Sequence, residues 1–459
     1  MPRDSQPIRP DELEALFAPH KESVDRASAL AVSGGSDSTA LMVLFADWLR
    51  QGGADTGAHT VLTIDHRLRP GSAAEARVVA DHAIALGFRH AILAWQGPKP
   101  QTGVQAAARE ARYRLMWDYM GAHDVATLLA AHTRDDQAET LLMRLARGSG
   151  LDGLSAMALW VEVGPGAGTG AVQIVRPLLG VAKARLRATL EERGIAWIED
   201  PSNQSPAFER TRWRAARGDL EALGLSSEML ALSARRLQRA RAALDAVTDE
   251  YCAEDGGVVR TDPCGLFRVA REKLRRAPEE IAVRVIGRCI AAAGGAGEPV
   301  PLAKLEPVVA RLWHGNDGDA AGSWTLARAQ ITAVGDVIQV EREPGRLALP
   351  VMTLAGGAKA LWDGRFVVEI ADGFEGRLEV RALGGAGLAE LKRAGKVVKG
   401  TSALLLVPSF WSENELLAVP AIDFWARGGL DRLISAGFAG LRYNLGAAGR
   451  TRRDDLEAC

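Results

Sequence analysis

The sequence predicts an α/β fold that begins with a doubly wound parallel sheet. Over residues 27–148, short apolar runs alternate with longer helical patterns, which is the order of elements in such a sheet. Residues 209–243 are helical in pattern and rich in arginine, and from residue 351 onward strand patterns predominate. We therefore expect a helical or mixed middle domain and a smaller, strand-rich C-terminal α+β domain. The length of 459 residues allows about three domains.

The elements of the expected sheet follow one another in a regular order. Its strands are nearly continuous apolar runs, as is typical of strands covered on both faces: ASALAVS (27–33), TVLTIDH (60–66), HAILAW (90–95) and ATLLAAH (126–132). Helical patterns separate and follow them at 37–50, 72–87, 101–121 and 135–147. The glycine-rich segment 164–170 fits a loose G-x-G-x-x-A, but a strand-like run follows it where a dinucleotide fold needs a helix. We expect a hairpin tip there.

The character of the chain changes after Pro201. Residues 209–243 hold eight arginines against four acidic residues, which predicts a basic helical zone. Helical patterns recur at 266–293 and 301–313, and EREPGRLALP (341–350) is typical of a linker. The runs RFVVEI, RLEVRAL, SALLLVP and ELLAVP, which come after it, predict strands.

The composition excludes several classes of protein. Apolar residues make up 47% and charged residues 25%, which excludes a disordered chain. The four cysteines form no C-x-x-C pair, which excludes a paired zinc knuckle and a thioredoxin-type motif. The first residues, MPRDSQPIRPDELEAL, contain no apolar h-region, and no apolar run reaches 18 residues, so we expect a cytoplasmic protein without a membrane partner. The formal charge of −1 leaves nucleic-acid binding open, because that depends on where the charges cluster.

The strongest local motif is a hexapeptide between an apolar strand and a helix. Its residues, the expected cofactor-binding group, are Ser33, Gly34, Gly35, Ser36, Asp37 and Ser38. Two glycines permit a tight turn, and the N-terminus of the following helix directs N–H groups at a bound phosphate. A carboxylate such as Asp37 beside phosphates requires Mg²⁺ between them. The chain has no G-x-x-x-x-G-K-[ST], so a kinase or GTPase of that type is excluded.

Further polar residues lie at the ends of the other predicted strands. His132, Asp136 and Glu139 follow the fourth strand, and Asp65 and His66 end the second. Because the carboxyl ends of the strands in a doubly wound sheet open onto one crevice, we expect these side chains to face the hexapeptide. Helix capping explains an acid at the helix start but not a histidine with two acids. Asp65 is expected to bind a ribose hydroxyl, whereas His66 at a strand end is more often a structural hydrogen-bonding group.

These motifs resemble those of the tRNA(Ile)-lysidine synthase family, a branch of the PP-loop (N-type) ATP pyrophosphatases with an adenine nucleotide α-hydrolase-like fold. SGGSDS matches the pattern SGGxDS, and IDHRLRPGSAAEA is similar to the second strand and loop, with Arg67 where glycine is usual. The stretch 131–154 is similar to the one that separates lysidine synthases from other PP-loop enzymes. RPLL (176–179), IEDPSN (198–203) and an arginine run at 210–214 extend the resemblance, which covers residues 27–216 closely.

The resemblance implies an ATP-dependent ligase that forms a carbon–nitrogen bond. In the family reaction, ATP adenylates the C2 oxygen of the wobble cytidine of tRNA(Ile) with a CAU anticodon and releases pyrophosphate. The amine of free L-lysine then displaces AMP from C2 and leaves lysidine. The implied cofactors are ATP and Mg²⁺, and the implied partners are this tRNA and L-lysine. A homodimer is left open.

Roles follow for the candidate catalytic residues. Asp37 and Asp136 are the expected magnesium ligands, whose remaining partners would be phosphate oxygens and water. Glu139 is expected to bind metal or to accept a proton from the lysine amine, which is nucleophilic only when neutral. His132 and Arg112 complete the catalytic set. Arg112, like Arg144, lies on a helix near the crevice, where an ordinary solvated charge is the alternative to pairing with a phosphate or the adenylated base.

The basic zone is the expected contact with the tRNA backbone, because clustered arginines bind phosphates. The residues chosen for this role are Arg210, Arg212, Arg214, Arg235 and Arg236. We expect the catalytic domain at 1–216, the basic tRNA-binding domain at 217–343, and a C-terminal domain with a further tRNA contact at 350–459. The basic residues that motivate this last contact are Lys392, Arg393, Lys396, Lys399, Arg450, Arg452 and Arg453.

Two other functions compete with the lysidine reaction. The first is another PP-loop adenylating enzyme that modifies tRNA, such as a thiolase. Residues 1–251 contain no cysteine, which argues against an iron–sulfur thiolase. The second is a nucleotide-binding sensor without catalysis, against which the three acids Asp37, Asp136 and Glu139 argue.

Overall fold

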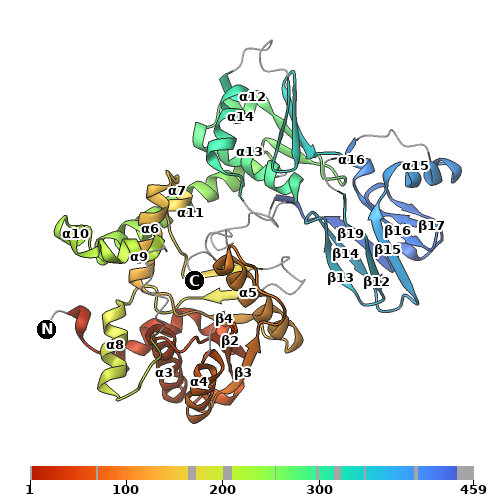
Figure 1. Ribbon diagram of the computed structural model, residues 1–459. Coiled ribbons are helices and arrows are strands. Elements are labelled where there is room, and N and C mark those ends of the chain that lie inside the picture. Colours follow the sequence, from red (N-terminus) through yellow and green to blue (C-terminus); the bar gives the residue numbers. More distant parts are fainter. Residues whose placement is uncertain are drawn as a thin grey trace. The chain divides into compact units, whose positions relative to one another are not determined.

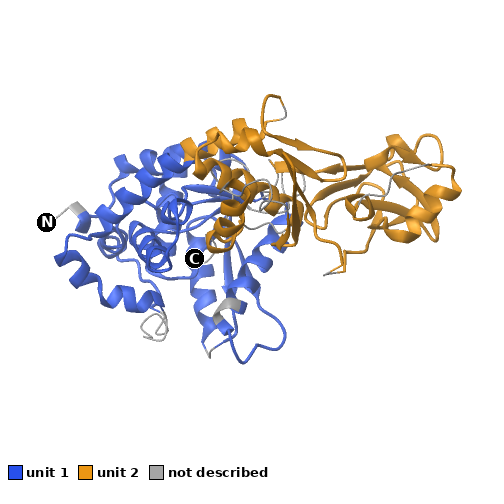
Figure 2. Ribbon diagram, turned by 90° about the horizontal axis from the view of Figure 1, so that it is seen from above, with its two compact units in different colours: residues 1–164, 170–241, 453–459 blue, residues 165–169, 242–452 orange. Residues whose placement is uncertain are grey.

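The computed structural model describes residues 3–68, 71–163, 172–199, 209–253, 255–295, 299–314, 322–345, 348–396 and 402–441. The chain forms two compact units (Figure 2). Unit 1 is built on Met1–Gly164 and Gly170–Arg241, and unit 2 on Ala242–Arg452. Among the described residues, no helix combines the length and the apolar character that crossing a membrane requires.

Unit 1 contains the predicted parallel sheet. The strand order is β3-β2-β1-β4-β6-β5, and every neighbouring pair is parallel except β5 and β6. The strands are β1 Ser28–Ala31, β2 Thr60–Asp65, β3 Arg89–Ala94, β4 Thr127–Leu129, β5 Trp160–Val163 and β6 Val172–Val175. The glycine-rich segment that we expect to be a hairpin tip lies outside the described residues, although its flanking strands β5 and β6 pair antiparallel, as a hairpin requires.

Helices cover both faces of this sheet, because alternate strand residues point to opposite sides. Leu30, Val61 and Leu129 pack with α3 and α4 in one core, whereas Ala29, Leu62 and Leu128 pack with α5 in another. Figure 1 shows α3 and α4 together on one side of the strands. The helices of unit 1 are α1 Leu13–Phe17, α2 Lys21–Val24, α3 Ser36–Gln51, α4 Ser72–Ala85, α5 Val104–Ala122, α6 Arg134–Ala146, α7 Leu151–Leu154 and α8 Lys183–Glu192. The predicted doubly wound α/β fold is confirmed.

The arginine-rich zone is helical, as predicted. It forms α9 Glu209–Ala215, α10 Arg217–Ala222 and α11 Ser227–Cys252. Ala138 and Leu142 of α6 pack with Leu230 and Ala234 of α11 in a small core. This packing holds the basic helices beside α6, which carries the candidate acids.

The first part of unit 2 is a five-stranded antiparallel sheet covered by helices. Its strands are β7 Val259–Thr261, β8 Phe267–Ala270, β9 Gly322–Leu326, β10 Ala329–Val334 and β11 Val337–Arg342, and its helices are α12 Arg271–Arg275, α13 Glu279–Gly294 and α14 Leu302–His314. The expected mixture of helix and strand is present, but the helical pattern at 266–293 begins with a strand, β8, and is divided between α12 and α13. Phe267 and Val269 alternate with Arg268 and pair with β11, and Pro278 precedes a separate helix.

The last part of unit 2 is strand-rich, as predicted. It contains β12 Met352–Ala355, β13 Lys359–Trp362, β14 Phe366–Ile370, β15 Arg377–Ala382, β16 Pro408–Ser412, β17 Glu415–Val419, β18 Phe424–Trp425 and β19 Ile434–Phe438, with helices α15 Gly384–Arg393 and α16 Ser402–Leu405. The predicted strand SALLLVP is wrong, since its first residues form α16 and β16 begins at Pro408. A short apolar run suits a buried helix turn as well as a strand.

Candidate functional site

The loop after β1 requires a glycine at position 34. Gly34 has φ +87°, a conformation that favours glycine, and a Cβ there would lie 2.5 Å from Cδ1 of Ile198 and 3.0 Å from Cγ2 of Val79. The amide of Ile198 also donates to the Gly34 carbonyl at 2.8 Å. The backbone is therefore held close to two neighbouring elements, and a larger residue would displace it.

The serines of the hexapeptide bind the loop to the start of α3. Oγ of Ser38 accepts from the Ser33 amide at 3.2 Å and donates to the Gly35 carbonyl at 3.1 Å. Gly35 is the N-cap of α3 and has no side chain to satisfy the first amides of that helix. The sequence-predicted phosphate-binding loop thus has the strand–turn–helix context that anion binding needs.

Asp37, in the first turn of α3, pairs with a cation that the sequence analysis did not identify. Nζ of Lys183, the first residue of α8, donates to its Oδ2 at 2.8 Å, and Ser36 donates to its Oδ1 at 3.1 Å. Burial raises the pKa of Asp37 and the charge of Asp136 adds to the rise, while Lys183 opposes it. The two candidate metal ligands are therefore close enough to repel each other.

Asp136 lies at the start of α6 and is held by the preceding residue. The amide and Oγ1 of Thr133 donate to its Oδ2 at 2.8 and 2.7 Å, forming a capping box. Burial acts to raise the pKa of Asp136, but His132, the bonds from Thr133 and the charge of Arg210 outweigh it, so the pKa lies below its usual value. Asp136 is therefore an ionised carboxylate, and its Oδ1 lies 4.0 Å from Nη2 of Arg214.

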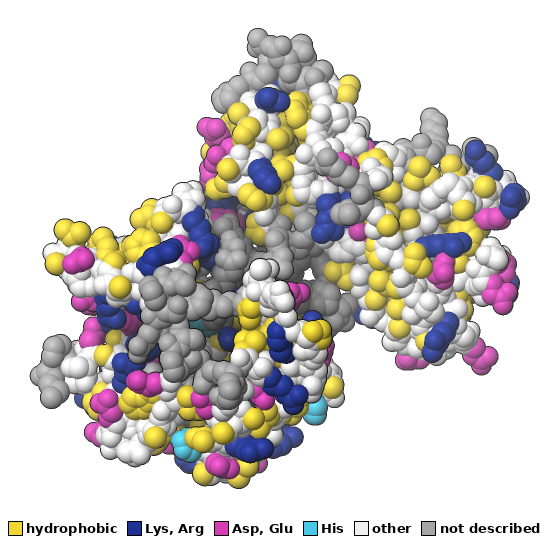
Figure 3. Space-filling model, viewed as in Figure 1, with side chains coloured by type: hydrophobic (Ala, Val, Ile, Leu, Met, Phe, Trp, Pro, Cys, Tyr) yellow, Lys and Arg dark blue, Asp and Glu magenta, His cyan; other side chains and the backbone are white. Residues whose placement is uncertain are grey.

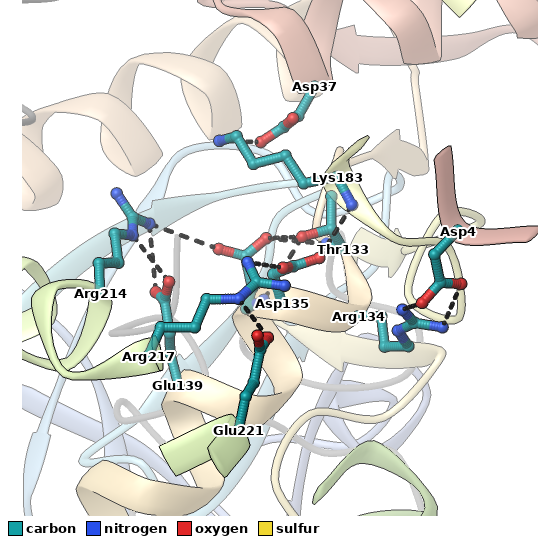
Figure 4. A network of polar contacts seen from close by, with 11 residues as sticks. Asp4, Asp37, Thr133, Arg134, Asp135, Glu139, Lys183, Arg214, Arg217 and Glu221 are labelled. Carbon is teal, nitrogen blue, oxygen red and sulfur yellow. Dashed lines mark hydrogen bonds and ion pairs between the residues drawn. The ribbon is translucent and has the colours of Figure 1, made fainter. Parts of the chain in front are cut away.

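Glu139, one turn further along α6, forms a two-point ion pair with Arg214 of α9. Nε and Nη2 of Arg214 donate to its two oxygens at 2.7 and 3.1 Å, and Nη2 lies 4.0 Å from Asp136 (Figure 4). Burial raises the pKa of Glu139, Asp136 adds to the rise, and Arg214 opposes it. A carboxylate with a raised pKa is suited to accept a proton near neutral pH.

A neighbouring acid, Asp135, connects three elements. Its Oδ2 accepts the backbone amide of Lys183 at 2.8 Å, and its Oδ1 accepts from Nη1 of Arg217 at 2.5 Å. Arg134, beside it in sequence, turns away and pairs with Asp4 at 2.5 Å (Figure 4). Asp135 thus fixes the start of α8, and with it Lys183, against the start of α6.

Asp65 lies at the carboxyl end of β2, as predicted, and its hydrogen bonds are to the following loop. Oδ1 accepts from the amide of Arg67 at 3.0 Å and from Oγ of Ser72 at 2.7 Å. Arg67 has φ +53°, which is a strained conformation for a side-chain-bearing residue and accounts for the glycine usual at this position in the family that the motifs resemble. Asp65 therefore fixes the shape of the loop that follows β2.

His66 and Arg112 lie together beside the end of β2. Nη2 of Arg112 is 3.5 Å from Nε2 of His66, whose ring meets Trp95 edge-on. Burial, and then the charge of Arg112, lower the pKa of His66 to about 4, so the imidazole is neutral. The predicted catalytic residue Arg112 is thus at the carboxyl edge of the sheet, on α5.

His132 and Arg144 are both buried, with different partners. Nδ1 of His132 accepts from Nε of Arg176 at 3.2 Å. Nη1 of Arg144 donates to the carbonyls of Gly153 and Ala156 at 3.0 and 3.1 Å, which fastens α7 to α6. The structure therefore places His132 at the site and gives Arg144 a supporting contact within α6 and α7.

The five arginines chosen for tRNA binding fall into two groups. Arg210 is half-buried and its charge acts on Asp136, while Arg214 binds Glu139. Arg212 on α9, and Arg235 and Arg236 on α11, are exposed. On the face drawn in Figure 3, Lys and Arg side chains lie among Asp and Glu side chains, as the near-neutral total charge suggests.

Sequence reasoning missed Lys183, Arg217 and Arg176. Lys183 begins the helix after β6, and Arg176 is the first residue beyond that strand. Had β6 been included among the parallel strands, the rule that their carboxyl ends form the site would have pointed to both. Arg217 carries no such signal, because its contact with Asp135 depends on how α10 packs.

The donor set suits a hard divalent cation bound together with phosphates. Asp37 and Asp136 supply carboxylate oxygens close enough that the charge of one raises the pKa of the other. Within the described ranges, no group of three or more His, Cys, Asp or Glu side chains is arranged to hold a metal ion by itself. A cation here would therefore take its other ligands from phosphate oxygens and water, as Mg²⁺ commonly does.

Comparisons with known proteins agree with these features. Residues 8–217 match the model of the PP-loop domain family. A tRNA(Ile)-lysidine synthase from Bradyrhizobium diazoefficiens is 42% identical over 75% of this chain and 96% of its own length, and one from Ruegeria pomeroyi is 37% identical over 89% and 92%. A solved U34-tRNA thiolase from Methanococcus maripaludis aligns with 49% of this chain and 80% of its own, at 15% identity and a TM-score of 0.39, a likeness too weak to carry an argument.

Proposed function

The chain belongs to the tRNA(Ile)-lysidine synthase family, and from this premise we propose that it ligates free L-lysine to C2 of the wobble cytidine in tRNA(Ile) with a CAU anticodon. The observation that carries the proposal is the meeting of Asp37, Asp136 and Glu139 next to the phosphate-binding loop. A nucleotide sensor has no need for three acids at this place. An adenylating ligase uses them for a metal and for proton transfer.

In the first step, the C2 oxygen of the cytidine attacks the α-phosphorus of ATP. The bond between that oxygen and phosphorus forms, the bond to the bridging oxygen breaks, and pyrophosphate leaves with the electron pair. Backbone amides of residues 33–38 would hold the departing phosphates, with the first turn of α3 directed at them. Asp65, at the end of the adjacent strand, is the residue that we propose binds the ribose.

Asp37 and Asp136 are the residues that would hold Mg²⁺, and the ion would neutralise charge on the phosphates. Nζ of Lys183 donates to Oδ2 of Asp37, one of these two acids. The side chain of Lys183 is 33% exposed and flexible, and we propose that its ammonium turns to a phosphate oxygen when a metal ion binds Asp37.

In the second step, the amine of lysine attacks C2, and the C2–oxygen bond breaks so that AMP leaves with that oxygen. The amine must lose a proton to be nucleophilic. Glu139 is the expected acceptor, because burial raises its pKa. Arg112 and His132, at the same edge of the sheet, would bind anionic oxygens of the substrates.

The anticodon stem must lie over this edge, with the cytidine turned out of its stack to reach ATP. We propose that the exposed arginines Arg212, Arg235 and Arg236 bind its phosphates, and that Arg210 and Arg214 lie closer to the reacting groups. The functional division proposed is a catalytic domain at 1–216, a basic domain at 217–343 and a C-terminal tRNA contact at 350–459. Lys392, Arg393 and Lys396 at the end of α15 support this last contact; Lys399, Arg450, Arg452 and Arg453 lie outside the described residues.

The test is incorporation of labelled lysine into tRNA(Ile) with a CAU anticodon, in the presence of ATP and Mg²⁺. Label on this tRNA, but not on methionine tRNA with the same anticodon, is expected. Pyrophosphate release that depends on the tRNA but leaves no lysine label would instead indicate another PP-loop modifying enzyme. No release at all would indicate a sensor. The reaction would take place in the cytoplasm, and light scattering of the purified protein would test for a homodimer.

A further inference from the structure

Arg176 and His132 meet at the carboxyl edge of the sheet because of strand pairing. β4 and β6 are parallel neighbours, with Leu129 opposite Val175, and the amide of Ala130 donates to the Val175 carbonyl at 2.9 Å. Arg176 is the first residue beyond β6, and His132 is the third beyond β4. Both side chains therefore start from fixed points of the same edge.

The guanidinium of Arg176 is fully buried and fixed at two points. Nε donates to Nδ1 of His132 at 3.2 Å, and Nη1 donates to the Ala158 carbonyl at 2.9 Å. The Arg176 amide also donates to the Leu159 carbonyl at 2.8 Å. Of the carboxylates that the structure describes, none lies at ion-pair distance from this guanidinium. A buried cation without a carboxylate partner lowers the stability of the protein. We therefore ask what its contact with His132 contributes to function.

That contact determines where the proton of His132 resides. A guanidinium has only donors, so the nitrogen that faces it must accept and therefore carries no proton. The remaining nitrogen, Nε2, then bears the hydrogen, and it can donate a hydrogen bond but cannot accept a proton.

We propose that Arg176 is a positioning residue that fixes the proton of His132 on Nε2, and that His132 serves as a neutral hydrogen-bond donor to an anionic phosphate oxygen of the substrate. The identity of that substrate rests on the proposed function, whereas the position of the proton does not. A fixed donor stabilises charge that develops on phosphate without reorganising during the reaction. Since His132 cannot act as a base in this form, Glu139 remains as the acceptor of the lysine proton.

The proton position can be measured directly in the full-length protein. With ¹⁵N-labelled histidine, long-range proton–nitrogen correlation spectra distinguish the two neutral tautomers and the imidazolium, and the variant His132→Gln identifies the signals of His132. A proton on Nε2 alone, near neutral pH, is the expected result. A proton on Nδ1, or on both nitrogens, would overturn the proposal, and this measurement requires neither activity nor a change at Arg176.

Removal of Arg176 tests its part in the arrangement. In Arg176→Met, the signals of His132 should move toward the other tautomer or the imidazolium; unchanged signals would show that Arg176 does not fix the proton. The matched control is Arg271→Met, which removes an equally buried arginine whose Nε donates to the Leu312 carbonyl in unit 2. This control should leave the His132 signals as they are.

Measurements of tRNA-dependent pyrophosphate release distinguish a hydrogen-bond donor from a general base at position 132. Glutamine can place an N–H near the position of Nε2 but cannot take up a proton. His132→Gln is therefore expected to retain tRNA-dependent pyrophosphate release within about tenfold of the unaltered protein, while His132→Ala falls by roughly a hundredfold or more. Equal loss in both variants would exclude the donor role. If the unaltered protein incorporates no lysine, the proposed function fails, but the spectra still decide the position of the proton.

Discussion

Two clusters of carboxylates and basic side chains, one in each unit, are built from similar residues but differ in exposure. At the sheet edge of unit 1, Asp37 binds Lys183 and Glu139 binds Arg214. The side chain of Lys183 is 33% exposed and that of Arg214 is 40% exposed. In unit 2, Asp363 binds Arg342 and Arg365, which are 3% and 1% exposed. The first cluster can exchange its cations for others from solvent, whereas the second cannot.

The residues around the unit 2 cluster explain why solvent does not reach it. Arg365 also donates to the Leu406 carbonyl at 2.6 Å, and burial lowers its pKa to about 10. Gly295, at the end of α13, touches the same turn so closely that a Cβ would lie 2.1 Å from the Asp363 carbonyl oxygen. This cluster joins the two parts of unit 2. Exposure of the cation, rather than the presence of an ion pair, therefore distinguishes the candidate site from the structural cluster.

The comparison predicts that the unit 1 cluster matters for activity and little for stability. Asp37→Asn should lower lysine incorporation by about 10³-fold, because charge on the phosphates is no longer balanced at the loop. The midpoint of thermal unfolding should change by only a few degrees, since burial already raises the pKa of Asp37 and Lys183 can be solvated. A large fall in thermal stability would mean that Asp37 has a structural role like that of Asp363.

The unit 2 cluster should show the opposite behaviour. Asp363→Asn leaves two buried guanidinium groups without a counter-charge and should lower the free energy of unfolding by about 3–5 kcal/mol, measured by urea denaturation. Glu415→Gln, which breaks the exposed pair with Arg427, is the matched control and should cost less than about 1 kcal/mol. Equal effects of the two substitutions would show that exposure does not distinguish the pairs.

Much of the candidate site in unit 1 could be predicted from sequence, because its acids lie in local patterns. The hexapeptide 33–38 and the start of α6 follow strands in the chain, and parallel strands bring such positions together. The cations Lys183 and Arg176 were not found, because they reach the edge through β6, which the sequence analysis did not include in the sheet. The error at α16 has a local cause, since a short apolar run fits a helix and a strand equally well. β8 was missed because its alternating pattern covers only four residues before α12 begins.

The exposed arginines of α11 allow the comparison to be extended to tRNA. The double variant Arg235→Ala, Arg236→Ala should weaken tRNA binding by about tenfold and reduce the dependence of log Kd on log salt concentration by about 1–2 units. The control is Arg9→Ala, which removes another exposed arginine, near the amino terminus, and should leave both quantities unchanged. An unchanged salt dependence in the double variant would exclude these side chains as phosphate contacts.

A third pair, between the amino-terminal segment and α8, has intermediate exposure and should have an intermediate effect. Arg185 donates to both oxygens of Glu12 at 2.7 and 3.0 Å, and this contact, opposed by burial, lowers the pKa of Glu12 from 4.5 to about 2. Because the pKa is lower in the folded state, the pair stabilises the protein fully above the unfolded value of 4.5, and this contribution is lost as the pH falls toward 2.

Arg185→Met should therefore lower the free energy of unfolding by about 1–2 kcal/mol near neutral pH, after allowance for solvent screening of a partly exposed pair. The difference from the unaltered protein should shrink as the pH falls from about 5 to about 2, because Glu12 then becomes protonated in both proteins. Urea denaturation at a series of pH values measures it. A difference that stays constant with pH would mean that Arg185 acts through packing of its aliphatic stem. Exposure would then not determine how much the unit 1 cluster, the unit 2 cluster and the Glu12–Arg185 pair each contribute to stability.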